Sequence, residues 1–202
     1  MVESVVKLPP PEQRGKKSLE EAISARRSVR RFRTDSLTLW HLSQLLWAAQ
    51  GITSGGLRAI PSAGATFPLV VYVLLGQQTV KSVSAGIYSY QPSNHSLKLH
   101  LDGDFRRELA GAALGQSFIA TCPVTLVICA IFSRTTYRYG KRGELYVHME
   151  AGHLGQNVAL QAVALDLATV MIGAFSNDDV VAVLGLKEDC KPLYIIPIGK
   201  PA

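Results

Sequence analysis

Residues 144–167, ELYVHMEAGHLGQNVALQAVALDL, place apolar residues at the three- and four-residue spacing of an α-helix. The run is about twice as long as an average helix, and small residues recur along it. A helix that is apolar over most of its surface has to be buried by other elements. We therefore expect this stretch to form the central helix of the fold.

On both sides of this helix the sequence predicts strands and shorter helices. β-branched and other apolar residues indicate interior strands at 69–75 and 123–132 and a last strand at 191–200. Residues 86–90 and 96–101 have the pattern of a hairpin. Helical spacing and capping signals predict a helix that starts at Ser18, helices at 38–51 and 104–114, the latter capped by Asp104, and a short helix within 171–186.

Ser18 and Glu21 have the spacing of a capping box, so the folded part of the chain is expected to begin there. Residues 1–17 are expected to be an irregular leader, and residues 18–202 a single domain. Helices outnumber strands, and the strands are scattered between them. We therefore predict an α+β fold in which helices flank one sheet.

The composition of the chain indicates its partners, the state of its cysteines and its location in the cell. The net charge of +6 favours anionic partners such as phosphates, nucleic acid or acidic membranes. The three cysteines Cys122, Cys129 and Cys190 lack CxxC spacing, and two lie in or beside an apolar run, as is typical of reduced thiols. The first residues lack the apolar core of a signal peptide, and no apolar run reaches the roughly 18 residues of a spanning helix. We expect a cytoplasmic protein that does not cross a membrane.

The segment SARRSVRRFR, residues 24–33, gathers five arginines around Ser28. Like charges three and four residues apart destabilise a helix, so helix formation gives no reason for the cluster. Several guanidinium groups and a hydroxyl can, however, bind one phosphate. The cluster indicates an anion site, with a solvated basic surface as the alternative.

Two further stretches are candidates for a functional role. In PSAGATFP, residues 61–68, small residues let the backbone approach a flat polar ligand, although they are also ordinary turn residues. In HMEAGH, residues 148–153, the histidines are five apart and lie on different sides of a helix. The single Glu-x-x-His pair, Glu150 and His153, is too little for a di-iron site. We expect structural pairing, capping or substrate contact there, and no metal.

Five motifs in this order resemble the nitroreductase superfamily of flavin enzymes: ARRSVRRF (25–32), LSQLLWAAQGIT (42–53), PSAGATFPL (61–69), RYGKRGELYVHMEAGHLGQN (138–157) and IGAF (172–175). The resemblance is strongest to the SagB-type branch, which includes the thiazole- and oxazole-forming azoline dehydrogenases, and it extends from Ser18 to Gly199. It implies a three-layer α+β sandwich with a mainly antiparallel sheet. It also implies an intertwined homodimer with non-covalent FMN at the interface.

The resemblance assigns expected roles to individual residues. The residues implied to hold the FMN phosphate and the flavin edge are Arg26, Arg27, Ser28 and Arg30, with Lys200 as a further phosphate partner. The residues that match the loop lying against the flavin from the other subunit are Pro61, Ser62, Ala63 and Gly64. Gly173 and Ala174 match the segment whose backbone amide faces flavin N5, where a donor would tune electron affinity.

One departure from the family pattern bears on the reaction. Arg138 and Tyr139 stand where azoline dehydrogenases have a Lys-Tyr pair, and an arginine stays protonated where a lysine can act as a base. These two residues are therefore expected to contact substrate or deliver a proton. Asp166 stands where relatives usually have glycine, and the sequence does not assign it a role.

The expected function is an FMN-dependent oxidoreductase that works by ping-pong hydride transfer. NAD(P)H would be the donor and an electron-poor small molecule, such as a nitroaromatic or a quinone, the acceptor. One alternative is oxidation of a peptide azoline or a related ring, with Tyr139 in the proton path. An alternative of another class is a basic nucleotide- or RNA-binding module without catalysis, but the aromatic residues that such surfaces interleave with basic ones are sparse. We therefore do not expect a nucleic-acid partner.

Overall fold

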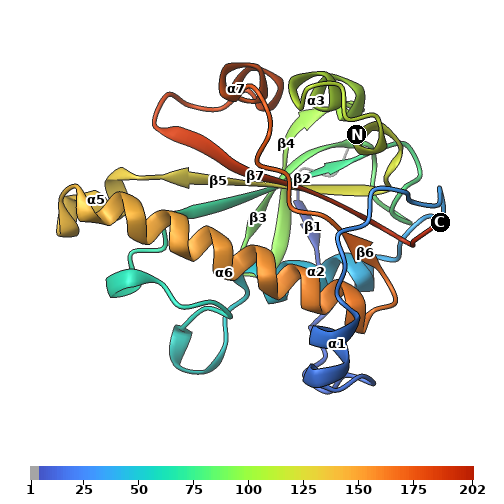
Figure 1. Cartoon of the computed structure of the whole chain (residues 1–202), viewed down its shortest axis with the longest axis horizontal. Coiled ribbons are helices and arrows are strands. Elements are labelled where there is room, and N and C mark those ends of the chain that lie inside the picture. The colour runs from blue at the N-terminus through green and yellow to red at the C-terminus, as the bar shows by residue number, and fades with distance from the viewer. Residues whose placement is uncertain (1–4) are drawn as a thin grey trace.

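A computed structural model describes residues 5–202, and in these residues one seven-stranded sheet runs through the molecule (Figure 1). The strand order is β1-β4-β3-β2-β5-β7-β6, and every neighbouring pair is antiparallel. The strands are β1 (Val5–Lys7), β2 (Leu69–Leu75), β3 (Gly86–Gln91), β4 (Ser96–Asp102), β5 (Val124–Ile131), β6 (Ala168–Thr169) and β7 (Cys190–Gly199). The predicted strands and hairpin are confirmed.

Helices cover both faces of this sheet, which confirms the predicted α+β sandwich. They are α1 (Leu19–Ala25), α2 (Leu39–Gln50), α3 (Arg106–Ala112), α4 (Phe118–Thr121), α5 (Ser133–Tyr139), α6 (Arg142–Ala164) and α7 (Asn177–Leu184), with 3-10 turns η1 (Ser54–Gly56) and η2 (Ala63–Ala65). The core cluster on one face includes α2 and α6, and the cluster on the other face includes α3, α4 and α7. The fold therefore has three layers.

Strand β5 shows how one sheet serves two cores. Leu126 and Ile128 point into the core beneath α2 and α6, whereas Val127 and Cys129 point into the core beneath α3 and α7. Successive side chains of a strand point to opposite faces. Because both faces are covered, β5 is apolar along nearly its whole length.

Helix α6 is the predicted central helix, and its small residues have a structural reason. A Cβ on Gly155 would lie 3.2 Å from Cγ of Met171, and a Cβ on Gly143 would lie 3.0 Å from the backbone of Thr136. Both distances are tighter than ordinary packing, so larger residues would push neighbouring segments away. The glycines let α5 and the segment that follows β6 approach the helix closely.

The expectation of an irregular leader over residues 1–17 is wrong for Val5–Lys7, which form β1 at the edge of the sheet; residues 1–4 lie outside the described part. Polar contacts hold the residues after β1 in place. The hydroxyl of Ser43 donates to the carbonyl of Pro9 at 2.6 Å and lies 2.7 Å from Nε2 of His95. Nδ1 of His95 lies 2.8 Å from the Tyr90 hydroxyl. This network joins the leader to α2 and to the β3–β4 hairpin.

Asp104 is not the N-cap of α3; Phe105 occupies that position. Two guanidinium nitrogens of Arg106 donate to the two carboxylate oxygens of Asp104, at 2.8 and 2.7 Å. The carboxylate also accepts the backbone N–H of Arg106 at 3.2 Å. The ion pair therefore replaces the predicted cap. At Ser18 and Glu21, by contrast, the predicted capping box is present.

Cys122, Cys129 and Cys190 are free and buried. Within residues 5–202, every helix is too short or too polar to traverse a lipid bilayer.

Candidate functional site

The arginine segment, residues 26–33, is extended and not helical, because α1 ends at Ala25. Its backbone lies beside the end of the sheet. Ser28 bridges Thr169 of β6, and the N–H of Val29 donates to the carbonyl of Thr169 at 3.1 Å. Further along, the N–H of Arg33 donates to the carbonyl of Lys200 at 2.9 Å. These contacts bring Lys200 to the arginine segment.

The side chains of this segment remain available. Arg27, Ser28 and Arg30 are exposed, and Arg26 is partly exposed. Within residues 5–202, none of Arg26, Arg27 and Arg30 has a carboxylate within ion-pair distance. Arg27 donates only to nearby backbone carbonyls. Several uncompensated guanidinium groups on one short stretch favour binding of an anion.

Lys200 lies on the same side of the molecule as the start of α2. Burial and the charge of Lys200 both lower the pKa of His41, which belongs to the capping box of α2 with Thr38. The sequence indicated no role for His41. It stays neutral more readily than an ordinary histidine, so it does not add charge to the basic cluster near physiological pH.

Gly173 and Ala174 follow β6 on the same edge of the sheet. Ile172, just before them, exchanges both backbone hydrogen bonds with Ile195 of β7, at 2.9 and 3.0 Å. Both Gly173 and Ala174 are exposed, and in the described part of the chain no atom beyond the two neighbouring residues lies within 4 Å of the place where a Cβ on Gly173 would be. A flat ring can therefore approach this backbone. The unpaired arginines and the open glycine together fit a phosphate-bearing planar group such as FMN.

The loop of residues 61–67 is held by its own polar contacts. The hydroxyl of Ser62 accepts the N–H of Phe67 at 3.0 Å, and the hydroxyl of Thr66 lies 2.8 Å from that of buried Thr135 in α5. Gly64, Ala65 and Phe67 have positive φ angles of 58°, 53° and 46°. The side chains of Ser62 and Thr66 stabilise the conformation of the loop itself, and the exposed residues Pro61, Gly64 and Ala65 form its outer surface.

Arg138 and Tyr139, at the end of α5, lie against this loop. Nη1 of Arg138 donates to the carbonyl of Gly64 at 3.3 Å. A Cβ on Gly64 would lie 2.5 Å from the hydroxyl of Tyr139, which leaves room only for glycine. The ring of Tyr139 packs edge-on against Tyr146 of α6, with centroids 5.2 Å apart. The fold thus brings the two predicted substrate-contact residues to the predicted flavin-contact loop.

Glu150 of α6 lies beneath the same loop. It is 3% exposed, and its Oε1 has no hydrogen-bond partner among residues 5–202. Burial raises the pKa of Glu150 to about 7, while Ser62, Gln50 and the charge of Arg58 oppose the shift. Glu150 borders a cavity of about 230 Å³ together with Pro61, Ser62, Ala63 and His153, among others. The acid is therefore half-protonated near neutral pH at the floor of this cavity.

The two histidines predicted to lie on different sides of a helix do so. His153 borders the cavity under the loop, whereas His148 packs edge-on against Phe132, with ring centroids 5.4 Å apart. Within residues 5–202, no three His, Cys, Asp or Glu side chains are grouped as a metal site would require.

Asp166, to which the sequence assigns no role, ends α6. Its φ of 58° is left-handed, a conformation that glycine adopts at lower cost. The N–H of Leu167 donates back to the carbonyl of Ala162 at 2.8 Å, as in a Schellman ending. Lys17 pairs with the Asp166 carboxylate at 2.5 Å and donates to the carbonyl of Val163 at 2.8 Å. Asp166 thus adds an ion pair that ties the leader to α6.

The predicted site residues form two groups at opposite ends of α6 (Figure 1). The arginine segment lies near the C-terminal end, where Arg27 and Val163 border one cavity. The 61–67 loop lies near the N-terminal half, over Glu150. At 1.5 Å per residue, Glu150 and Val163 are about 20 Å apart along the helix. The chain therefore does not bring the two groups together within one molecule.

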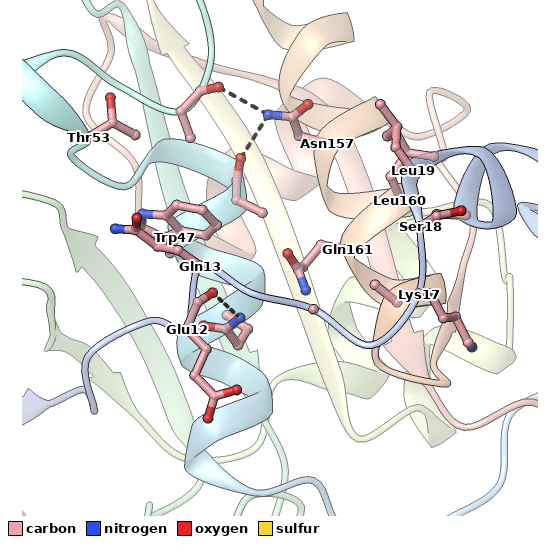
Figure 2. Close-up of a pocket in the computed structure, with 16 residues that line it drawn as sticks. Glu12, Gln13, Lys17, Ser18, Leu19, Trp47, Thr53, Asn157, Leu160 and Gln161 are labelled. Carbon is pink, nitrogen blue, oxygen red and sulfur yellow. Dashed lines mark hydrogen bonds between the residues drawn. The ribbon is translucent and has the colours of Figure 1, made fainter.

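A further cavity of about 400 Å³ lies between α2, α6 and the leader (Figure 2). Its wall includes Trp47 and Asn157, whose amide nitrogen donates to the carbonyls of Ala48 and Ala59, both at 3.2 Å. None of the predicted cofactor-binding or substrate-contact residues borders it. It is separate from both groups.

Comparison with known proteins shows which protein family the chain belongs to. The sequence profile of the Nitroreductase family matches residues 23–200, so the chain belongs to this family and is an oxidoreductase of the flavin-enzyme type. It is 46% identical over 183 residues, 90% of each chain, to MJ1384 of Methanocaldococcus jannaschii, whose name places it among the nitroreductases.

Two further relatives extend this comparison. A crystal structure of a Ralstonia eutropha protein, also named for the nitroreductases, superposes with a TM-score of 0.86 at 31% identity, over 99% of this chain and 90% of that one. The microcin B17-processing protein McbC of Escherichia coli is 27% identical over 139 residues, which are 65% of this chain and 49% of McbC. The chain thus spans about half of McbC. The predicted membership of the nitroreductase superfamily is confirmed.

Sequence reasoning missed Arg58, Arg134 and Thr135, which hold the 61–67 loop. Arg58 lies over the Phe67 ring, 4.9 Å from its centroid, and Arg134 donates to the carbonyl of Phe67 at 3.0 Å. The signal for Arg58 was present in the sequence, since it is the only charged residue between His41 and Lys81. Arg134 and Thr135 are distant in sequence from the 61–67 loop that they contact, so the sequence around the loop does not indicate these contacts.

Proposed function

We propose that the protein is an FMN-dependent oxidoreductase that transfers hydride from NAD(P)H to an electron-poor acceptor such as a nitroaromatic or a quinone. One observation carries the proposal. Arginines without a counter-ion lie beside Lys200 and along the sheet edge that leads to an open glycine, Gly173. This combination suits a cofactor with a phosphate at one end and a flat ring at the other.

Each group of residues has a separate task in this proposal. Arg26, Arg27, Ser28, Arg30 and Lys200 would bind the phosphate and the ring edge through charge-assisted hydrogen bonds. Their positive charge would also favour the extra negative charge of the reduced ring. When bound, FMN supplies the hydride chemistry.

The backbone at Gly173 and Ala174 would orient the ring and place an amide N–H beside it. The side-chain amide of Gln116 donates to the carbonyl of Ala174 at 3.2 Å, which holds the peptide between Ala174 and Phe175. Open space at Gly173 is needed because a side chain there would separate the backbone from the ring.

The separation of the two groups supports a shared site between two copies of the chain. Pro61, Ser62, Ala63 and Gly64 lie about 20 Å along α6 from the arginine end. A second copy could place its loop over the ring held by the first, which would also exclude water. We therefore propose a homodimer with the cofactor at its interface.

Arg138 and Tyr139 would then face the acceptor from the second copy. The fixed charge of Arg138 can hold an oxygen-rich acceptor, and the Tyr139 hydroxyl can donate a proton or a hydrogen bond. Neither side chain can act as a strong base at neutral pH, so the proposed roles are positioning and proton donation.

The similarity to McbC favours one second candidate, the oxidation of a peptide azoline or related ring. Arg138 in place of a lysine argues against it, since a base is then missing. A synthetic peptide azoline, added to protein loaded with FMN, tests this candidate. We expect no oxidation by the natural chain and measurable oxidation after R138K; equal oxidation by both would favour the azoline reaction.

The experiment for the main proposal is spectroscopic. Purified protein is incubated with FMN, separated from the excess and examined by visible absorbance, and then NADH or NADPH is added without oxygen. We expect a stable flavin band that bleaches with one of the two donors and returns when a nitroaromatic or quinone is added. Failure to retain FMN would contradict the proposal. RNA, tested by salt-dependent binding of an oligonucleotide, would then be the next anion to consider.

A further inference from the structure

A second cluster of positive groups lies against Phe67 of the 61–67 loop. A cleft of about 240 Å³ opens there between β2, β3 and α5. The polar and aromatic residues that border it include Gln50, Arg58, Phe67, Tyr90, Gln91 and Arg134. None of these residues belongs to the arginine segment, and none is among those proposed to contact the flavin, although Arg58 and Arg134 hold the 61–67 loop through Phe67.

Arg58 is half-buried without a counter-ion. One of its guanidinium nitrogens donates to the carbonyl of Gln50 at 3.0 Å, and the group stacks on Phe67. Within the part of the chain that the structure describes, no carboxylate lies within ion-pair distance of Arg58. Burial of an unpaired charge is costly, and a guanidinium has four further N–H groups to satisfy.

Arg134 brings a second guanidinium to the same cleft. Its Nη1 donates to the carbonyl of Phe67 at 3.0 Å, so the Phe67 peptide and ring lie between the two arginines. Arg134 is exposed, and it too lacks an acidic partner within residues 5–202. Its remaining donors are free to bind a ligand.

A third donor at the cleft is buried and unsatisfied. Gln50 is 2% exposed, and among residues 5–202 its Nε2 has no hydrogen-bond partner within 3.5 Å, although its side chain lies close enough to Glu150 to lower the pKa of that carboxyl. An unmade hydrogen bond at a buried amide costs about 1–3 kcal/mol, so native proteins rarely leave one without reason. Gln50 is therefore shared between the cleft and Glu150, and the two arginines are the residues whose donors remain available at the cleft.

We propose that this cleft binds the carboxylate of a small organic acid, with the carboxylate between Arg58 and Arg134 and the rest of the molecule against Phe67. Guanidinium groups match a planar carboxylate through paired hydrogen bonds, and the aromatic ring offers an apolar surface beside them. The Glu150 carboxyl lies close enough to Arg58 for its charge to oppose the lowering of the Arg58 pKa by burial. The same negative charge would repel a second charge on the ligand, so a doubly charged anion is disfavoured. The site is independent of the proposed flavin chemistry.

Benzoate is a suitable probe, and benzamide is its uncharged isostere. Each is titrated by calorimetry at constant ionic strength into the protein as purified and after saturation with FMN, which occupies the arginine segment if the proposed function is correct. We expect benzoate to bind in both cases and benzamide not to bind. Loss of flavin binding with retained benzoate binding would contradict the proposed function and leave the carboxylate site intact.

Substitutions locate the site. R134Q should weaken benzoate binding by about tenfold, the usual effect of one charge-assisted hydrogen bond. R142Q, which removes an equally exposed arginine at the start of α6, should leave the affinity unchanged. The Arg134 side chain is on the surface, so R134Q is expected to fold, and its circular dichroism and thermal midpoint verify this.

Three results would overturn the inference: no heat of binding up to about 10 mM benzoate, equal binding of benzamide, or an affinity unchanged by R134Q. Inorganic sulfate is the last comparison. If sulfate displaces benzoate with equal affinity, the cleft is a general anion site and the carboxylate assignment is wrong.

Discussion

The arginine segment and the 61–67 loop, the two groups of predicted cofactor residues, are built in opposite ways. In the segment, backbone hydrogen bonds to β6 and to Lys200 fix the chain, and the side chains remain exposed. In the loop, the side chains of Ser62 and Thr66 fix the chain, and small residues form the outer surface.

Because of this difference, the affinity for a ligand and the stability of the fold should depend on different residues. Charged side chains that make few contacts within the protein can be changed with little effect on folding, yet they dominate the affinity for an anion. Side chains that satisfy buried partners contribute to folding wherever they lie. Changes in the segment should therefore alter ligand affinity, and changes in the loop should alter stability.

The largest expected effect is in the arginine segment. R30A should weaken FMN binding by about 10- to 100-fold, because one charge-assisted contact to phosphate is lost. Riboflavin, which lacks the phosphate, should bind R30A and the natural chain equally. Fluorescence titration measures both, and R107A, on α3, serves as the control. An equal loss for riboflavin would mean that Arg30 contacts the ring or supports the fold.

The next largest effect concerns Glu150 and pH. The Glu150 carboxyl has a pKa of about 7 in the folded protein and near 4.5 in the unfolded chain. Between pH 4.5 and 7 the folded state therefore binds more protons than the unfolded state. The free energy of unfolding should therefore fall as pH rises from about 4.5 to 7 and then level off. The full shift corresponds to about 3 kcal/mol, and solvent screening at the adjacent open cavity reduces the expected fall to about 2 kcal/mol.

Urea unfolding of E150Q across this pH range tests the effect. E150Q should match the natural chain at low pH, exceed its stability by about 2 kcal/mol at pH 8, and lose most of the slope. E144Q, at an exposed glutamate of the same helix, should keep the natural slope. A natural slope in E150Q would show that other groups cause the pH dependence.

G64A should destabilise the protein by about 1–2 kcal/mol, since alanine is strained at a φ of 58° and its Cβ would displace Tyr139. Gly55 is a matched control, because its φ is 68° and nothing lies within 4 Å of its Cβ position. The difference between G64A and G55A in thermal unfolding measures the contact with α5. Equal losses would mean that only backbone strain matters.

The smallest expected effect is that of T135V, about 1 kcal/mol, because it removes the hydrogen bond to Thr66 and keeps the shape of the side chain. T136V, next in sequence, removes a bond to the carbonyl of Phe132 within α5 and serves as the comparison. In T135V the affinity for FMN should change less than in R30A. A larger change would contradict the separation of binding from stability.

Local signals in the sequence predicted most of the fold. The helix start at Ser18 and the interior strand at 123–132 depend on residues close together in the chain, and both are confirmed. The cap at Asp104 failed because Arg106 competes for the same carboxylate. Propensity rules consider each residue separately and do not take such local ion pairs into account.

Less of the candidate site than of the fold could be predicted from the sequence. The arginine cluster and the 61–67 loop are recognisable as short motifs, but their contacts are not. The bond between Arg138 and Gly64 joins residues far apart in sequence, and the burial of Glu150 depends on α2 and the loop together. Such convergence follows only from the packing of several elements.

Helix α6 also constrains how the length of this chain can change in evolution. One inserted residue would shift the end of the helix by about 1.5 Å and rotate everything beyond it by about 100°. Glu150 would then leave the loop, or Asp166 would leave Lys17. We expect insertions and deletions among homologous sequences to accumulate in exposed turns such as residues 53–57, and α6 to keep its number of residues.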